Sequence, residues 1–255
     1  MSSYRKILYD AENGIARLTL NRPDKRNALD REMLDEIAQV LRSSSEDKSV
    51  RVVIVTGAGK DFCSGADLAA LQTASQADVL DNMADARVMA DLFLQMRHHR
   101  CPIVAVVRGR ALAGGCGLAT AADLIVASES AQFGYPEVNI GFVPAMVMGI
   151  LRRSVAEKRA FELIAMGEAI SSARAFEIGL INRVFTDETF STDVEAYASK
   201  LAAKPSSAVH LSKNLLYHID AMPFESAIQS GVQMNAIART TADCQLGIAR
   251  FLKKL

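Results

Sequence analysis

Two glycine-containing turns have the residue types needed to stabilise negative charge on an oxygen atom. In the first, residues 61–68 (DFCSGADL), Gly65 can relax the backbone so that the next amide points into a cleft. The second, residues 109–118 (GRALAGGCGL), leads into a predicted helix, whose first amides are unpaired and lie at the positive end of the helix dipole. Two amides that converge on one carbonyl would stabilise the charge that develops on its oxygen. Either turn taken alone is more often ordinary scaffold.

A carboxylate, Glu137, is the candidate acid–base group. It lies in residues 133–138 (FGYPEV), and a glutamate in such a stretch is more often a surface or ion-paired residue when nothing else is known. Asp67 is the other carboxylate close to a turn, and its position before a helical segment predicts a structural N-cap. From the residues alone, the role of Glu137 stays open.

Other reactive side chains near these segments favour structural roles. Cys116 lies next to the second turn but has no paired base nearby in the sequence, so we expect it to pack rather than to act as a nucleophile. His98 and His99 end a helical run just before Arg100. Cations at the C-terminal end of a helix complement its dipole, and we expect that role for both histidines.

The composition excludes several classes of function. The chain has 255 residues, half of them hydrophobic, which predicts a folded protein rather than a disordered one. Lys+Arg and Asp+Glu both number 29, so a formal net charge of zero gives no attraction for nucleic acid, although a local basic pocket could hold a phosphorylated ligand. The cysteine spacings resemble neither a zinc site nor a disulfide framework, so no metal is expected. The four cysteines are Cys63, Cys101, Cys116 and Cys244.

Targeting and membrane signals are weak. No charged segment followed by an apolar one opens the chain, and no apolar run approaches the ~18 residues of a membrane span. We therefore expect a cytoplasmic protein without a membrane partner. The last three residues, 253–255 (KKL), resemble the peroxisomal Ser-Lys-Leu signal only faintly.

The elements that must position these residues alternate between strands and helices in the first half of the chain. Residues 15–20 alternate apolar and polar types, which predicts a strand with one wet face. Residues 52–56, 103–107 and 124–126 are continuous apolar runs, which predict strands buried on both faces. Asp30 is a good N-cap for a helix with one apolar stripe.

The second half changes character. From Pro144 onward the pattern is mostly that of amphipathic helices, with almost no strand signal, and helices are expected after Pro205 and Pro223. We therefore predict an α/β fold with two parts. Residues 1–200 form a strand-rich core and residues 201–255 form a helical C-terminal region.

Several motifs, in order along essentially the whole chain, resemble those of the crotonase family, the enoyl-CoA hydratases and isomerases. They are similar to the family's early CoA-binding loop, its first and second oxyanion loops and its catalytic glutamate segment. The matching segments are 21–23 (NRP) with 27–29 (NAL), 62–68 (FCSGADL), 111–119 (ALAGGCGLA) with 122–127 (ADLIVA), and 133–138 (FGYPEV) with 141–144 (GFVP).

The resemblance implies a fold and a site. The fold would be a spiral of ββα turns with a C-terminal helical trimerisation region. The backbone N–H groups of Ala66 and Gly114 would bind the thioester oxygen, and Glu137 would act as acid and base. No metal or redox cofactor is implied, because coenzyme A arrives as part of the substrate. Residues expected at the CoA thioester are Lys25, Arg26, Ala28, Ala66, Asp67, Leu68, Gly114, Phe251 and Lys254.

One departure from the family pattern concerns catalysis. Family hydratases usually carry two glutamates, and Gly117 stands at the position that matches the first of them. The first hypothesis is a hydratase or dehydratase that uses Glu137 alone to take a proton from water and return it to Cα. Sequences with this glycine resemble the methylglutaconyl-CoA hydratase group, which implies branched or carboxylated acyl groups and, in metabolism, fatty acid or branched-chain amino acid degradation.

Two other functions stay open at this point. A Δ3-Δ2 enoyl-CoA isomerase needs only one glutamate, which moves a proton between Cα and Cγ. A CoA- or RNA-binding scaffold is the alternative from a different class, and the zero net charge gives RNA binding no support. Acyl-chain length, direction and pathway are not encoded in these patterns.

The helical region after Pro205 predicts a homo-oligomer, a trimer or a dimer of trimers. Its apolar residues occupy more than one helix face, and a single face would suffice for packing on the core. Phe251 and Lys254 lie one helical step apart, so both can face a CoA site, including that of an adjacent subunit.

Overall fold

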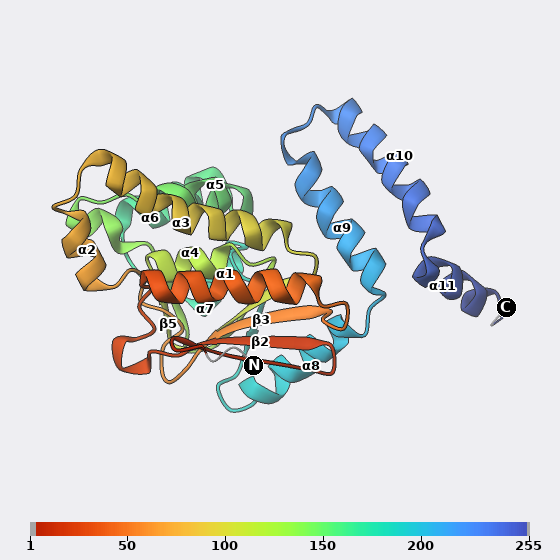
Figure 1. Ribbon diagram of the computed structural model, residues 1–255, viewed down its shortest axis with the longest axis horizontal. Coiled ribbons are helices and arrows are strands. Elements are labelled where there is room, and N and C mark those ends of the chain that lie inside the picture. Colours follow the sequence, from red (N-terminus) through yellow and green to blue (C-terminus); the bar gives the residue numbers. More distant parts are fainter. Residues whose placement is uncertain (1–3, 254–255) are drawn as a thin grey trace.

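The structure, a computed structural model, describes residues 4–253. A six-stranded sheet forms its centre, in the order β1-β2-β3-β4-β6-β9 (Figure 1). β1 is antiparallel to β2, and the remaining neighbours are parallel. The strands are β1 (Ile7–Glu12), β2 (Ile15–Leu20), β3 (Val52–Gly57), β4 (Ile103–Val107), β6 (Leu124–Ser128) and β9 (Arg183–Phe185).

A second, three-stranded sheet gives the chain its repeating path. It consists of β5 (Arg110–Leu112), β7 (Gln132–Gly134) and β8 (Ile170–Ser171), in that order. β4 and β5 lead into helix α4 (Gly114–Thr120), and β6 and β7 lead into α5 (Ala145–Ser154). A parallel bridge between Cys63 and Ala111 adds the loop after β3 to the same layer. The predicted α/β class and its ββα turns are therefore confirmed.

Helices cover both faces of the large sheet. On one face lie α1 (Arg31–Glu46), α3 (Val79–His98) and α4, which share a core cluster with β2, β3 and β4. On the other face lies α8 (Phe190–Ala202) (Figure 1). The predicted wet face of residues 15–20 is therefore wrong. Ile15 is buried in the α8 cluster, and Arg17 on the same face pairs with Glu195 of α8 at 2.5 Å.

The predicted N-cap of the first long helix is confirmed. The Asp30 carboxylate accepts a hydrogen bond from the Met33 N–H at 2.9 Å, which caps α1. The expectation of mostly helices after Pro144 is confirmed, and the strands among the described residues there are the short β8 and β9. The further short elements are η1 (Pro23–Lys25), α2 (Leu68–Ala74), η2 (Pro136–Ile140), α6 (Glu157–Met166) and α7 (Ser172–Glu177).

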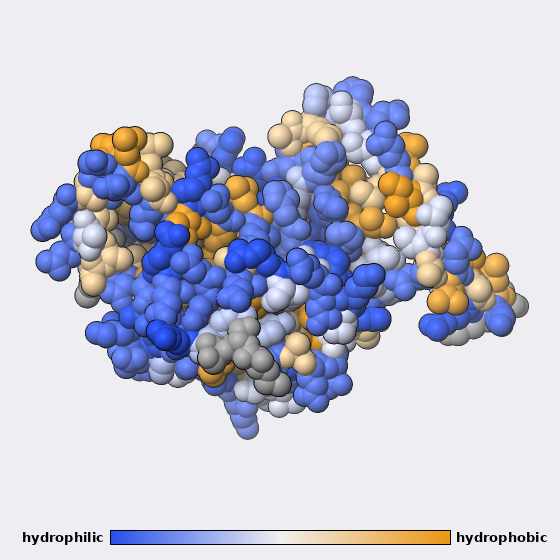
Figure 2. Space-filling view, in the orientation of Figure 1, coloured by the Kyte–Doolittle hydropathy of each residue, from blue (hydrophilic) through white to orange (hydrophobic). Residues whose placement is uncertain are grey.

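The C-terminal helices form an arm that leaves the core (Figure 1). The arm consists of α9 (Ser206–His218), η3 (Ile219–Ala221), α10 (Phe224–Thr240) and α11 (Ala242–Leu252). None of the described residues of α10 and α11 is buried, and large apolar side chains such as Phe224 and Val232 are exposed. Figure 2 shows hydrophobic residues gathered on this arm. The boundary between residues 1–200 and 201–255 stays a prediction.

A buried ion pair anchors α9 to the core. The Lys213 ammonium donates to an Asp123 carboxylate oxygen at 2.7 Å and to the Met96 and Cys101 carbonyls. The Tyr217 hydroxyl donates to the other Asp123 oxygen at 2.6 Å. These bonds satisfy the buried charge of Lys213, so the arm is fixed at its base.

His99 departs from its expected role at the end of α3. It is buried between α1 and β4, where its ring contacts Ser44 at 3.1 Å and the Cys101 carbonyl at 3.0 Å. Burial lowers the pKa of His99 to about 4, so the ring is neutral at pH 7. The predicted dipole role is therefore wrong for His99, and it stays a prediction for the exposed His98. Across residues 4–253, no helix is both long and apolar enough to cross a lipid bilayer.

Candidate active site

The two glycine turns meet at one point of the molecule. Gly65 has a φ of +96°, and a Cβ added there would lie 2.8 Å from the Ala113 Cβ and 3.2 Å from the Gly114 N. A Cβ added to Gly114 would lie 3.9 Å from the Ala66 N. Only glycine fits at position 65, because its conformation is left-handed and its Cβ would collide with the opposing turn. The close approach brings the Ala66 and Gly114 amides side by side.

Both amides are available as hydrogen-bond donors. The neighbours of Ala66 are held in place, because Leu29 donates to the Gly65 carbonyl at 2.8 Å and Asp67 donates to the Leu29 carbonyl at 2.9 Å. Gly114 is the first residue of α4, so its N–H has no partner within the helix. Neither amide donates to another residue in the described part of the chain. Two such donors can stabilise an oxyanion.

An unusual backbone conformation precedes the second amide. Ala113 has a φ of 50°, which is uncommon for a residue with a side chain, and its own N–H donates to the Gly134 carbonyl at 2.9 Å. The hydrogen bond to β7 therefore holds the turn in a conformation that Ala113 would otherwise avoid. The chain enters α4 directly after this turn, with the Gly114 N–H free.

Glu137 lies in η2 beside α4. Its Oε2 atom is buried and has no hydrogen-bond partner among residues 4–253. Burial raises the pKa of Glu137 above its ordinary value. The Glu137 charge in turn contributes to the raised pKa values of Cys116 and Tyr135, which places the carboxyl close to α4. A carboxyl with a raised pKa and an oxygen free of hydrogen bonds is suited to accept and return a proton.

The space beside Gly117 is filled with hydrocarbon. A Cβ at this position would lie 3.3 Å from the Phe93 Cζ and 3.5 Å from a Val147 methyl carbon. Met89 and Leu29 extend the apolar surface, since each has a methyl carbon 3.8 Å from the Cβ position of Gly114. The site thus has one carboxyl and an apolar wall instead of a second carboxyl.

Cys116 has the packing environment expected of it. Its side chain is fully buried in α4, and burial raises the pKa of its thiol to about 11. A thiol with such a pKa stays protonated at neutral pH and is a poor nucleophile. Next to it, the Tyr135 hydroxyl lies 2.7 Å from the Thr120 hydroxyl, so both buried hydroxyl groups are satisfied.

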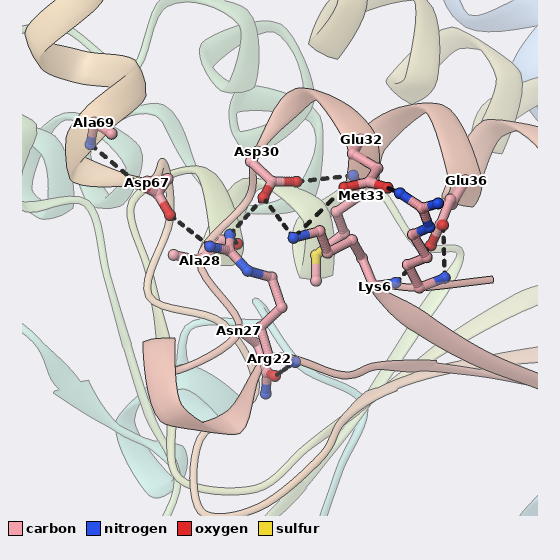
Figure 3. A network of polar contacts seen from close by, with 11 residues as sticks. Lys6, Arg22, Asn27, Ala28, Asp30, Glu32, Met33, Glu36, Asp67 and Ala69 are labelled. Carbon is pink, nitrogen blue, oxygen red and sulfur yellow. Dashed lines mark hydrogen bonds and ion pairs between the residues drawn. The ribbon is translucent and has the colours of Figure 1, made fainter.

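A polar network ties the first turn to the loop before α1 (Figure 3). The Arg22 guanidinium donates to an Asp67 oxygen at 2.8 Å and to the Ala28 carbonyl at 2.7 Å, and it pairs with Asp30 at 2.9 Å. Asp67 also accepts from the Ala69 N–H at 3.0 Å, so the predicted N-cap is confirmed. Arg22 therefore holds the residue that directly follows Ala66.

The other residues predicted to bind CoA belong either to segments near the glycine turns or to the C-terminal end of the chain. Lys25 and Arg26 are exposed in the loop next to Arg22, and the Arg26 carbonyl accepts from the Ser64 N–H at 3.0 Å, while Ala28 is buried. Leu68 begins α2, and its side chain lies outside the described part of the structure. Phe251 is exposed on α11, far from the turns of the same chain (Figure 1). Lys254 lies outside the described residues.

Sequence reasoning missed three contributors to the site. Arg22 was part of a matched motif, but its partner Asp67 lies 45 residues away along the chain. Phe93 and Met89 lie on α3, whose sequence has little amphipathic pattern to mark its buried side. No group of His, Cys, Asp and Glu between residues 4 and 253 is arranged to hold a metal ion.

Comparisons with known proteins agree with this geometry. Residues 10–255 match the family model described as enoyl-CoA hydratase/isomerase. A Thermus thermophilus protein is 37% identical over 240 residues, 94% of this chain and 95% of that protein. The 2,3-dehydroadipyl-CoA hydratase of Escherichia coli K12 is 30% identical over 98% of this chain and 96% of its own length. A crystal structure of enoyl-CoA hydratase from Mycobacterium smegmatis superposes with a TM-score of 0.94 at 33% identity, covering 98% of this chain and 97% of that one.

Proposed function

The chain belongs to the enoyl-CoA hydratase/isomerase (crotonase) family, and from this premise we propose that it hydrates 2-enoyl-CoA thioesters with Glu137 as the acid–base group. The observation that carries the proposal is the buried, unpartnered Oε2 of Glu137 beside the helix that begins with a free Gly114 amide. A buried polar atom without a partner is rare in folded proteins, and a substrate or water molecule would satisfy it.

The reaction needs one carboxylate and two amides. The thioester oxygen accepts hydrogen bonds from the Ala66 and Gly114 N–H groups, which stabilise the enolate that forms when Cβ is attacked. The Glu137 carboxylate takes a proton from water as the water oxygen bonds to Cβ. The protonated Glu137 then gives that proton to Cα, and the enolate returns to a thioester. The carboxylate is restored, and the net change is the addition of water.

The raised pKa of Glu137 suits both halves of this cycle. A carboxylate in a poorly solvated site is a stronger base than one in water, so it removes a proton from water more readily. The proton it gains is transferred back to carbon within the same site. Desolvation thus makes the one carboxyl of the site a better base.

The apolar side chains beside Gly117 restrict which acyl groups fit the site. Phe93, Val147 and Met89 would contact the carbons next to the double bond, where a charge would be buried without a partner. A methylglutaconyl group, with its carboxylate two bonds from Cβ, is therefore a poorer fit than a hydrocarbon segment at that position. We propose acyl groups that are uncharged around Cβ.

An isomerase with the same residues is the second candidate. Glu137 could move one proton between Cα and Cγ of a 3-enoyl-CoA. The hydrocarbon beside Gly117 has no polar group that could hold a water molecule there. Incubation with crotonyl-CoA and with 3-hexenoyl-CoA separates the two activities when the products are examined both by mass and by the absorbance of the conjugated 2-enoyl thioester. Hydration adds the mass of water, whereas isomerisation changes only the position of the double bond. Failure to add water to crotonyl-CoA would contradict the hydratase.

Coenzyme A and oligomer formation complete the proposal. Lys25 and Arg26 would meet the CoA phosphates, and Phe251 and Lys254 would contact the CoA bound by an adjacent subunit. The exposed apolar side chains of α10 and α11 support burial against other copies of the chain, in a trimer or a dimer of trimers. No resident cofactor is proposed. Light scattering at micromolar concentration checks the oligomer, and a monomeric mass would contradict it.

A further inference from the structure

A cavity of about 430 Å³ lies between α3, α4, α5 and α9. One part of its lining is apolar and includes Phe93, Met146 and Ile150, whereas another part carries Arg97 and Arg153. This volume falls within the range of small-molecule sites, which are mostly apolar with a few polar groups that fix orientation. The proposed reaction makes no use of the cavity.

The cavity continues the surface on which the acyl group would lie. Gly117 is followed on the same face of α4 by Thr120 and Ala121, three and four residues later, and both of these line the cavity. From Gly114 to Ala121 the helical rise is about 10 Å, at roughly 1.5 Å per residue. Phe93 lines the cavity and also reaches Gly117. The Phe93 ring is thus the partition between the candidate site and the cavity.

The polar end of the cavity has an excess of positive charge. Arg97 donates to the Asp220 Oδ2 at 2.9 Å, and Arg153 donates to the same oxygen. Each guanidinium has five N–H donors, so one carboxylate oxygen leaves donors of both side chains available. Nearby, Lys213 is paired with Asp123. In this cluster three cations face two carboxylates, which leaves one positive charge without a counter-charge.

The position of the two arginines is fixed by the arm. Arg97 stacks over the Tyr217 ring at 4.1 Å, and Tyr217 is bonded to Asp123 at the base of α9. α9 lies beside the C-terminal end of α3 (Figure 1). Arg97 is therefore held at the cavity, and Arg153, whose side chain is 47% exposed, is held there through Asp220.

We propose that this cavity binds the carboxylate at the far end of an acyl chain whose thioester lies at Ala66 and Gly114. The inference rests on the proposed function and names its substrate class: medium-length 2-enoyl-CoA thioesters with a terminal carboxylate. A ligand that satisfies both the apolar wall and the free guanidinium donors must carry hydrocarbon and an anion in one molecule. Guanidinium groups bind carboxylates through strong, charge-assisted hydrogen bonds. To reach the cavity, the acyl chain would have to pass the Phe93 ring.

The test compares substrates that differ only at the chain end. 2-Hexenoyl-CoA ends in a methyl group where 2,3-dehydroadipyl-CoA ends in a carboxylate, and 2-octenoyl-CoA with 2,3-dehydrosuberyl-CoA forms a longer pair. We expect wild-type kcat/KM to favour the carboxylate by about tenfold in at least one pair, as for one charge-assisted hydrogen bond. Arg153→Met should lower that ratio about tenfold, and Arg153→Lys should keep most of it.

Arg152 provides the matched control. It is the adjacent residue, 71% exposed at its side chain and absent from the cavity lining, so Arg152→Met should leave the ratio unchanged. Because the ratio compares two substrates in one variant, a general loss of activity or folding cancels. A wild-type preference for the methyl end in both pairs would overturn the proposal, and so would an unchanged ratio in Arg153→Met.

A binding experiment separates this proposal from the proposed function. Adipyl-CoA and hexanoyl-CoA cannot be hydrated, and calorimetry gives the ratio of their affinities without turnover. An enzyme that hydrates no 2-enoyl-CoA, including crotonyl-CoA, would defeat the proposed function, while this affinity ratio would still decide the cavity. Free adipate tests the other source of a carboxylate. If it binds as tightly as adipyl-CoA while the two CoA ligands bind equally, the cavity takes loose anions and the proposal falls.

Discussion

The two walls of the candidate site are built in opposite ways. The amide wall is the backbone of the two glycine turns. Hydrogen bonds hold Gly65 and Asp67, on either side of Ala66, and leave the Ala66 N–H free. The carboxyl wall is made of side chains, and Glu137 lies there with a buried oxygen that has no hydrogen-bond partner among the described residues. The first wall gains its chemistry from precise position and the second from poor solvation. Changes to the two walls should therefore fail in different ways.

The largest effect should come from the carboxyl wall. Glu137→Gln keeps the shape of the side chain but cannot exchange a proton at neutral pH. We expect kcat for crotonyl-CoA to fall by a factor of about 10²–10⁴, with KM little changed. Steady-state kinetics beside the exposed control Glu188→Gln measure the effect. Near-normal turnover in Glu137→Gln would show that the proton is carried by another group.

The amide wall should be broken by a single methyl group. Gly65→Ala forces a side chain into a left-handed conformation and places its Cβ 2.8 Å from that of Ala113. The turns must then separate, and loss of one oxyanion donor lowers kcat by about 10²–10³. Gly149→Ala, where the added Cβ meets nothing within 4 Å, is the control. A Gly65→Ala enzyme that is folded by circular dichroism and has normal kcat would refute the placement of Ala66.

Replacement of Arg22 should have a smaller effect on kcat, caused by a change in the position of the Ala66 amide and not by lower stability of the fold. Arg22→Met removes the clamp on Asp67, so the Ala66 amide loses its fixed direction, and we expect kcat to fall by about 10- to 100-fold. Arg22→Lys should restore part of the loss, because one donor can still reach Asp67. Arg31→Met removes an exposed pair with Asp35 and serves as the control. A change confined to the melting temperature would mean that Arg22 only supports the fold.

The smallest expected effect is on stability and has a defined pH dependence. The pKa of Glu137 is raised in the folded state, so ionisation costs folding free energy. The cost is absent below the unfolded-state pKa, grows as the pH rises from that pKa to the folded-state pKa, and is constant above it. Glu137→Gln should therefore raise the melting temperature by a few degrees at pH 7 and by less at pH 4. A larger gain at pH 4 would contradict burial as the cause of the pKa shift.

Local signals in the sequence predicted much of the frame. The buried strands β3 and β4, the Asp30 cap and the two glycine turns each depend on residues close together in the chain, where propensity and pattern decide the conformation. The short strands β8 and β9 were missed because two or three residues carry no readable alternation. The covered face of β2 was missed because α8, which covers it, begins 170 residues after β2 ends.

Contacts between distant segments account for what the sequence left open at the site. Phe93 fills the space beside Gly117 from α3, a helix whose sequence has little amphipathic pattern to mark its buried side. The neutral state of His99 follows first from its burial, which lowers its pKa, and the Lys213 charge, from a distant helix, lowers that pKa further. The motif match located Glu137, whereas the absence of a partner for its Oε2 is visible only in three dimensions.

The hydrogen bonds that hold the first glycine turn affect when the protein gains activity during folding. Leu29 and Arg22 position the Ala66 amide. Leu29 bonds to Gly65, 36 positions further along the chain, and Arg22 bonds to Asp67, 45 positions further along. Contacts of such long sequence separation form late, because the intervening chain must first be ordered. A partly folded chain can therefore hold most of its helices while its oxyanion site does not yet exist. In refolding, catalytic turnover should appear after the circular dichroism signal and report completion of the core.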